Sequence, residues 1–202
     1  KNSTVFSACV VSEVKSHAIS IALGAWVWNL KTDKKKEEPT IFVASKDAQI
    51  VKDAAAIAQA ICTTRDLVHT PANIKTPAWM GKQAEECAKG TGLTVKIFAG
   101  TSLKEFGGLR AVGGSSPKPG PRMIQVTYQP KSKKKSANAL PHVVLVGKGI
   151  TFDTGGVSLK RPYDTMMAMK SDMAGSAAIL GTLTALEELQ PNVKVTALMM
   201  MA

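Results

Sequence analysis

The feature that most constrains this chain is one stretch, residues 146–178, which reads VGKGITFDTGGVSLKRPYDTMMAMKSDMAGSAA. It follows an apolar run typical of a strand, crosses a glycine-rich segment that carries lysine and aspartate, and enters a run of small residues typical of a helix. Ligand sites in open α/β sheets lie beyond the carboxyl ends of strands. We therefore expect this stretch to bring polar side chains to a pocket, with the preceding residues as its scaffold.

The first 68 residues predict the end of a small domain followed by a helix. Apolar runs at 17–28 and 40–44 are interpreted as strands. Residues 45–68 carry apolar side chains at the i, i+4, i+7 and i+11 spacing of one helical face, with Ser45 as the expected N-cap. We expect residues 1–44 to be the C-terminal part of a small α/β domain and residues 45–68 to link it to a larger one.

Residues 69–202 alternate between helical and strand-like patterns. The expected elements are a helix from Pro77 to about Lys89, a strand at 93–98, a short polar helix ending at Gly107 and Gly108, strands at 122–128 and 142–146, and a helix at 173–189. This alternation predicts parallel β-α-β units in an α/β fold. The run at 142–146 is continuously apolar after its histidine, so we expect a central strand covered on both faces.

Composition describes an ordinary globular protein, with 45% hydrophobic and 20% charged residues among 202. No apolar run approaches the roughly 20 residues that span a bilayer, so we expect no membrane segment. The net charge of +11 is concentrated in two lysine runs, at 31–36 and 131–135, that lack aromatic residues for base stacking. Solvated loops explain these runs best, while a basic nucleic-acid-binding protein stays open as an alternative.

The three cysteines predict no disulfide framework, because Cys9, Cys62 and Cys87 form no C-x-x-C pair and their number is odd. Cys62 and Cys87 fall within helical patterns whose neighbours are apolar or small. We therefore expect buried thiols in a reducing compartment.

Two phosphate-binding motifs are excluded for the glycines that follow the strand at 142–146. A P-loop needs glycine five positions before the Gly147-Lys148 pair and serine or threonine after it, but those positions hold His142 and Gly149. A dinucleotide-binding fingerprint needs a third glycine where Phe152 stands. The stretch is therefore not a phosphate loop of either kind.

What remains is two lysines and two aspartates around a Gly-Gly turn. Asp153 and Asp172 could together hold divalent cations, although each aspartate alone is better explained by a structural role at a strand end or a helix cap. An unpaired buried ammonium is costly, so Lys148 and Lys160 could each ligate metal as a neutral amine or stabilise an oxyanion as a cation. The combination suggests metal-assisted hydrolysis of a carbonyl compound.

These residues resemble a known family. The segments VGKGITFDTGG, SLK and MKSDMAGSAA are similar to those of the leucyl aminopeptidase family of cytosolic dinuclear-metal exopeptidases. The segment RDLVHTPAN resembles the linker signature of the family, which usually has asparagine where His69 stands. The likeness extends from about residue 65 to residue 202. It implies an α/β catalytic domain around a mixed sheet flanked by helices.

The resemblance also implies a role for each site residue. Lys148 would be a metal ligand, Asp153 would bridge two divalent ions, either zinc or manganese, and Asp172 would bind the same ion as Lys148. Lys160 would polarise the scissile carbonyl and stabilise the gem-diolate intermediate. Met169 would line the pocket for the first side chain of the substrate, although an ordinary core position explains a lone methionine equally well.

The sequence departs from the family pattern in two places. Eleven residues separate Lys160 from Asp172, one more than in the commonest pattern, so we expect the intervening loop to bulge and to displace Met169. The second cluster of the family, an Asp-Ala-Glu-Gly-Arg segment, is absent from the 202 residues. In the family that cluster supplies two further carboxylate ligands and the arginine that holds a bicarbonate ion acting as base.

The resemblance therefore implies a metal-dependent aminopeptidase that releases N-terminal residues from peptides, cytoplasmic and assembled as a hexamer. The apolar run at 193–201 reaches the last residues, so we interpret the chain as the first part of the catalytic domain and expect it to be inactive alone. Two alternatives stay open. One is nucleic-acid binding on a peptidase-like scaffold, and the other is a degenerate scaffold without bound metal.

Overall fold

A computed structural model describes residues 4–7, 10–30, 40–116, 120–131 and 140–202. In chain order the elements are β1 (Thr4–Ser7), η1 (Val11–Glu13), α1 (Val14–Ala25), β2 (Thr40–Val43), α2 (Ala48–His69), α3 (Pro77–Ala88), β3 (Thr94–Ala99), η2 (Gly100–Leu103), α4 (Gly107–Gly113), β4 (Arg122–Tyr128), β5 (His142–Gly149), α5 (Tyr163–Met167), η3 (Ala168–Ser171), α6 (Ala174–Leu189) and β6 (Lys194–Met201), where η marks a short 3₁₀ helix. The larger of its two sheets has the strand order β3-β4-β6-β5.

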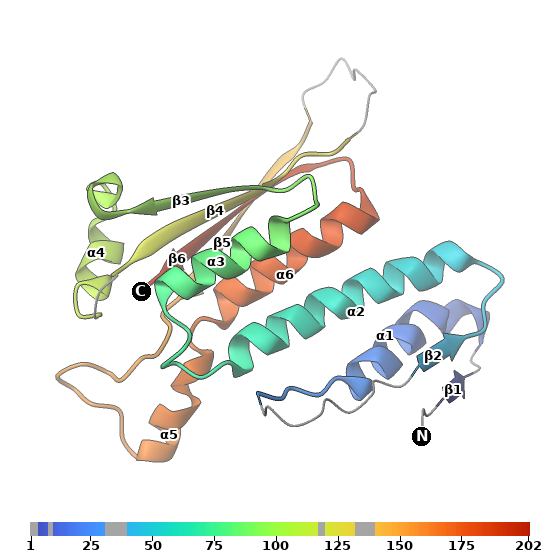
Figure 1. Ribbon diagram of the computed structural model, residues 1–202, viewed down its shortest axis with the longest axis horizontal. Helices are drawn as coiled ribbons and strands as arrows, with labels where there is room; N and C mark the ends of the chain where they lie inside the picture. Colours follow the sequence, from blue (N-terminus) through green and yellow to red (C-terminus); the bar gives the residue numbers. More distant parts are fainter. Residues whose placement is uncertain (1–3, 8–9, 31–39, 117–119, 132–139) are drawn as a thin grey trace.

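The large sheet is mixed, as predicted. β4 pairs antiparallel with both β3 and β6, and β5 pairs parallel with β6. Among the described strands of this sheet, only β5 and β6 with the intervening α6 form a parallel β-α-β unit of the predicted kind, because β3, β4 and β6 alternate in direction. Helices α3 and α6 cover one face of this sheet, and α2 forms a further layer outside α6 (Figure 1).

The hydrophobic core lies between the sheet and these helices. Its largest fully buried members are Met80, Ile124, Val126, Tyr128, Met173, Leu180, Leu183, Met199 and Met201. Helix α2 approaches α6 closely at Gly181, where a Cβ atom would lie 2.6 Å from the carbonyl oxygen of Ala60. Small residues on both helices therefore let the outer layer reach the inner one.

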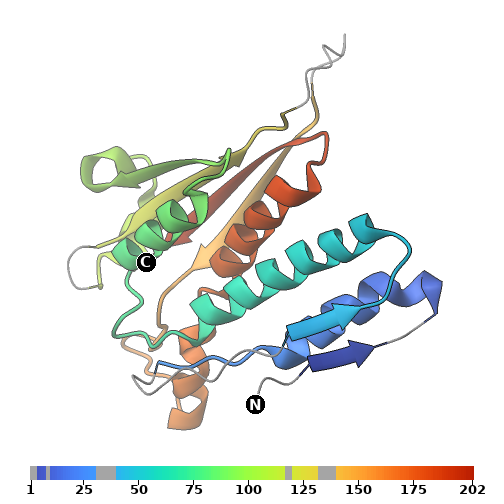
Figure 2. The same ribbon diagram turned by 45° about the vertical axis from the view of Figure 1, so that its right-hand side comes forward.

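The run at 17–28 is a helix rather than the predicted strand. Helix α1 covers most of it and packs against α2, as Figure 2 also shows. Its buried residues, Val14 and Ala18, are four positions apart and so lie on one helical face. A short apolar run does not distinguish a buried strand from a buried helix, which is why the prediction was wrong. The strand expected at 40–44 is confirmed as β2, which pairs parallel with β1.

The helix expected at 45–68 is confirmed as α2, but it starts later. Asp47, not Ser45, is the N-cap of α2, because its Oδ1 accepts hydrogen bonds from the backbone N–H groups of Gln49 and Ile50. Ser45 instead hydrogen-bonds to the backbone of Asp47. Helix α3 is confirmed with Pro77 at its first position and the Thr76 hydroxyl as its cap.

Strand β5 differs most from its prediction. It extends to Gly149, and among the described residues it pairs only with β6, so it lies at the edge of the sheet rather than at its centre. Val143, Val144 and Val146 are all exposed, the last at 66%. A continuous apolar run is typical of a strand with both faces covered, but the exposed valines show that β5 is not covered in this way, so the prediction of a central strand was wrong.

The glycines at 107–108 begin a helix instead of ending one. Helix α4 continues past Gly108, where no helix was expected, and the polar segment before it is the 3₁₀ turn η2. Glycine often stops a helix, but here Phe106 stands at the N-cap position and the helix continues to Gly113.

Three further predictions meet the structure only in part. The lysine runs, apart from Lys131, and Cys9 lie outside the described residues.

Cys62 and Cys87 are half-buried rather than buried. Burial, followed by the charge of Glu86, raises the pKa of the Cys87 thiol. Within the described ranges, no helix combines the length and the apolar character needed to cross a membrane.

Candidate metal centre

The site forms where the end of β5 meets the start of α6. Glycine makes this contact possible, because a Cβ atom at Gly147 would lie 2.8 Å from backbone atoms of Gly175 and Ser176. The buried Ser176 hydroxyl donates to the carbonyl oxygen of Gly147 at 3.0 Å. Lys148, which follows Gly147 in β5, and Asp172, which precedes Gly175 near the start of α6, are therefore held side by side.

The first pair of site residues is Lys148 and Asp172. The Lys148 Nζ lies 2.8 Å from Asp172 Oδ1, and this hydrogen bond is the main cause of a raised pKa for Lys148. The ammonium is thus paired and exposed, so the cost of an unpaired buried ammonium does not apply to Lys148. Asp172 does not cap α6, since Met173 occupies the N-cap position and no side chain caps that helix end.

The second pair is Asp153 and Lys160. Asp153 Oδ2 lies 3.3 Å from Lys160 Nζ, and its Oδ1 accepts a hydrogen bond from the N–H of Gly155 at 2.8 Å. That backbone hydrogen bond is the first cause of the lowered pKa of Asp153, and Lys160 adds to it. Gly155 has φ +91°, and a Cβ atom there would lie 2.4 Å from Ser158 O, so the turn requires glycine.

The two pairs form one cluster. The charge of Lys148 contributes to the lowered pKa of Asp153, and the charge of Asp153 contributes to the raised pKa of Lys148. The structure therefore brings together the four charged residues that the sequence singled out. Two carboxylates and two ammonium groups alternate around the end of β5.

Met169 lies in η3, one turn before Asp172, and is half-buried. The segment predicted to bulge between Lys160 and Asp172 folds as the short helix α5 followed by η3. In it the Arg161 guanidinium lies 5.3 Å from the centre of the Tyr163 ring. The pocket role of Met169 stays a prediction.

One atom of the cluster is left without a partner. Asp172 Oδ2 is buried and makes no hydrogen bond to any described residue. A buried carboxylate oxygen without a donor is costly, and a cation would satisfy it. Asp153 and Asp172 supply the oxygen donors that hard divalent ions prefer, and Lys148 could add a nitrogen. These residues therefore fit a divalent metal ion.

They do not complete a metal site. Across the described parts of the chain, no three His, Cys, Asp or Glu side chains lie close enough together to hold a metal ion. The resemblance implies two further carboxylate ligands from an Asp-Ala-Glu-Gly-Arg cluster, and that segment does not occur in the 202 residues.

A pocket of about 450 Å³ opens beside Lys148. Its lining is mainly apolar and includes Phe106, Leu109, Val112 and Met200. Lys148 and Gly149 form part of the wall, so the charged cluster and the apolar space share the end of β5. The sequence patterns did not reveal this pocket, because no helix was expected after Gly108.

Sequence reasoning also missed Lys75, whose side chain is completely buried. Its Nζ donates hydrogen bonds to three backbone carbonyl oxygens, one of which belongs to Lys170 in η3. Lysine is common at protein surfaces, so no sequence signal separates Lys75 from the other lysines of this chain.

Comparison with solved structures identifies the class of protein that this architecture defines. The leucyl aminopeptidase from Trypanosoma brucei in complex with bestatin superposes with a TM-score of 0.82 at 28% identity, over 100% of this chain and 39% of that chain. The bottromycin maturation enzyme BotP in complex with Mn gives a TM-score of 0.81 at 34% identity, over 95% and 40% of the two chains. The fold is that of aminopeptidase structures.

Sequence comparison then gives the family. The catalytic domain of the cytosol aminopeptidase family matches residues 62–202. The chain therefore belongs to the cytosol aminopeptidase family. A probable cytosol aminopeptidase of Mycobacterium bovis is 39% identical over 166 residues, and one of Mycobacterium ulcerans is 37% identical over 161 residues. These matches cover 81% and 78% of this chain.

The chain spans about a third of the length of these curated relatives, 32% and 31% respectively. The match therefore concerns one part of a longer protein in each relative. The family expected from the sequence motifs is confirmed. The nucleic-acid-binding alternative receives no support, because these relatives are named as aminopeptidases.

Proposed function

We propose that this chain is part of a metal-dependent aminopeptidase that removes N-terminal residues from peptides through a dinuclear metal site. One observation carries the proposal: Asp153 and Asp172 converge at the end of β5, each paired with a lysine, and Asp172 keeps a buried oxygen without a partner. Family membership supports the reaction class. Because the chain spans a third of its relatives, the activity is assigned to the complete protein.

Lys148, Asp153 and Asp172 would hold the metal. A divalent ion there would supply Lewis acidity for the attack of water on the scissile carbonyl group. Zinc and manganese both suit this donor set, and the Mn complex of BotP at 34% identity supports manganese. The second ion, and the bicarbonate that the resemblance implies, would depend on the Asp-Ala-Glu-Gly-Arg cluster that these 202 residues lack.

Lys160 would act as the electrophile. Its Nζ contacts Asp153 at 3.3 Å, and the tight turn at Gly155 fixes its backbone through a hydrogen bond from its N–H to Thr154 O. An ammonium held in this way can donate to the carbonyl oxygen of a substrate and stabilise the negative charge that develops on it. Met169, close in sequence to Asp172, would contact the first side chain of the peptide.

The remaining parts of the proposal concern the whole protein. We propose that it acts in the cytoplasm on peptide substrates and assembles as a homo-oligomer, hexameric as the resemblance implies. Residues 1–44 would be the C-terminal part of a small domain, residues 45–68 the linking helix and residues 69–202 the first part of the catalytic domain. The small β1-β2 sheet, separate from the large one, supports this division.

Substitution of Lys160 tests the central role. In the full-length protein, Lys160→Ala should lower the turnover of leucine amide by about a hundredfold to a thousandfold, because a preorganised donor to the oxyanion is lost. Bound metal, measured by elemental analysis, should stay at the wild-type level.

Lys131→Ala is the matched control. Lys131 also pairs with a carboxylate, that of Glu187, but at the other end of α6. Its loss should leave turnover unchanged. Wild-type turnover by Lys160→Ala would remove the electrophile role, and a wild-type protein that holds no metal would overturn the proposed function itself.

A further inference from the structure

The buried side chain of Lys75 joins two segments that are far apart in sequence. Its Nζ donates to the carbonyl oxygens of Leu67 at 3.1 Å and Val68 at 2.9 Å, both in the last turn of α2. It also donates to the carbonyl oxygen of Lys170 in η3 at 2.7 Å. An ammonium group has three donors, and all three are used here.

These contacts suit the charge of the group. The last carbonyl oxygens of a helix lack partners within the helix and carry partial negative charge, so a cation is favoured beside them. Lys170 also directs its ammonium to this helix end, at 3.5 Å from His69 O. Burial, and then the charge of Lys170, lower the pKa of Lys75 to about 8.

The segment that Lys75 contacts carries two residues of the proposed site. Met169 is adjacent to Lys170 in η3, and Asp172 follows two positions later, with its N–H donating to Met169 O at 3.0 Å. Lys75 is itself anchored by a hydrogen bond from its N–H to Pro71 O. A small displacement of Lys170 would therefore be transmitted to Asp172, and sites of this kind tolerate little displacement.

We propose that Lys75 is a positioning residue, which holds η3 against the C-terminal end of α2 and thereby fixes Asp172 and Met169 in the site. This inference rests on the proposed function of that site. An apolar side chain such as methionine would fill the same volume. A buried ammonium does what methionine cannot, because it donates to three carbonyl oxygens. One of these belongs to Lys170, in the segment that leads to Asp172.

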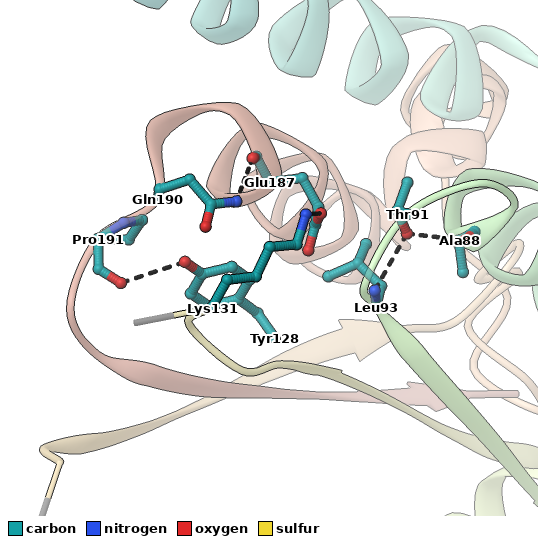
Figure 3. Close-up of polar contacts among 8 residues, drawn as sticks. All are labelled: Ala88, Thr91, Leu93, Tyr128, Lys131, Glu187, Gln190 and Pro191. Carbon is teal, nitrogen blue, oxygen red and sulfur yellow. Dashed lines mark hydrogen bonds and ion pairs between the residues drawn. The ribbon is translucent and has the colours of Figure 1, made fainter. Parts of the chain in front are cut away.

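The test compares the full-length wild-type protein with two variants. Lys75→Met keeps an unbranched side chain of similar length and removes the ammonium. Leu93→Ala is the control, since Leu93 is a buried residue just before β3, near the opposite end of α6, as Figure 3 shows. Both variants should lose stability, but only Lys75→Met should disturb the site.

Hydrogen exchange of the metal-free proteins is the first measurement. Lys75→Met should speed exchange at residues 168–172 at least about tenfold relative to wild type, because the carbonyl of Lys170 loses its anchor. Leu93→Ala should leave these residues unchanged. Wild-type exchange at 168–172 in Lys75→Met would overturn the proposal. If that variant does not fold, Lys75→Gln, which keeps two N–H donors on a shorter side chain, should show a smaller increase in exchange.

Titration with Co²⁺ is the second measurement, because its visible absorption reports the ligand geometry. Lys75→Met should bind Co²⁺ about tenfold more weakly and with altered bands, as expected when support of a ligand is lost, whereas Leu93→Ala should match wild type. Faster exchange with unchanged Co²⁺ affinity and spectrum would reduce Lys75 to a structural residue. If the wild type binds no Co²⁺, the proposed function fails while the exchange result still decides the role of Lys75 in holding η3.

Discussion

The two ends of α6 carry the same local arrangement in different surroundings. Asp172, just before the helix, pairs with Lys148, and Glu187, in its last turn, pairs with Lys131 at 3.1 Å (Figure 3). Both carboxylates are largely buried, and in both one oxygen is buried without a hydrogen-bond partner. A buried carboxylate with a lysine partner is therefore not enough to define a site.

What differs is the set of neighbours. At the Asp172 end a second carboxylate, Asp153, lies within electrostatic reach of Lys148, and an apolar pocket opens beside them. At the Glu187 end, Tyr128 donates from its hydroxyl to Pro191 O, and a Cβ atom added at Gly92 would lie 3.0 Å from the unpartnered Oε1 of Glu187, so this carboxylate is packed against neighbouring segments. Converging charge next to open space distinguishes a candidate centre from a packed ion pair.

The comparison is tested most strongly by removing one carboxylate charge at each end. In the full-length protein, Asp172→Asn should weaken Mn²⁺ binding by about a hundredfold or more. Loss of a residue that only supports a metal ligand lowers metal affinity by about tenfold to a hundredfold, and loss of the ligand itself should lower it at least as much. Glu187→Gln should leave the affinity unchanged. Isothermal titration of the metal-free proteins gives both values, and equal affinities for the two variants would contradict the distinction between the two ends.

A smaller effect is expected from adding a methyl group at each end. Gly147→Ala places a Cβ atom 2.8 Å from backbone atoms of Gly175 and Ser176, so α6 must move away from β5. We expect a loss of about 1 to 3 kcal/mol in the free energy of unfolding.

The counterpart is Gly92→Ala, whose Cβ atom would meet only side-chain atoms, the nearest being Glu187 Oε1 at 3.0 Å. Side chains adjust more readily than backbone, so we expect a loss below about 1 kcal/mol. Urea unfolding of both variants measures the difference. A larger loss for Gly92→Ala would show that the Glu187 end is the less adjustable one.

The smallest effect concerns pH and the lysine behind the site. The pKa of Lys75 falls from 10.5 to about 8 in the folded protein, so between these values the unfolded chain binds the extra proton. The free energy of unfolding therefore rises with pH in this window relative to Lys75→Met, which has no group to titrate. Between pH 7 and 9 the wild type should gain about 1 kcal/mol over the variant in urea unfolding. A constant or shrinking difference would contradict the lowered pKa.

The sequence predicted the helices that have clear caps and periodic faces. Thr76 and Pro77 marked the start of α3, and the spacing of apolar residues marked α2. It failed where the pattern has two interpretations. The run at 17–28 packs mostly as a helix against α2, and the valines of β5 stand at a sheet edge, because neighbours that lie far away in sequence decide both outcomes.

The site was predictable in its charged residues and not in its support. Lys148, Asp153, Lys160 and Asp172 stand in one stretch, and the structure brings them together. Their pairing could not be predicted, because it depends on the contact of Gly147 with Gly175 across β5 and α6. Lys75 is 95 residues from Lys170, so only the fold reveals their hydrogen bond.

The pairing of β4 with β6 bears on the order of folding. Tyr128 in β4 is opposite Val195 in β6. Strand β5, the segment 150–173 that carries most of the site residues, and α6 all lie between them in sequence. Pairing of β4 with β6 therefore closes a long loop of chain. The entropy lost in closing this loop must be paid before most of the stabilising contacts can form. We expect α2 and α3, which depend on local contacts, to form early, and the four charged residues to meet only when β6 has joined the sheet.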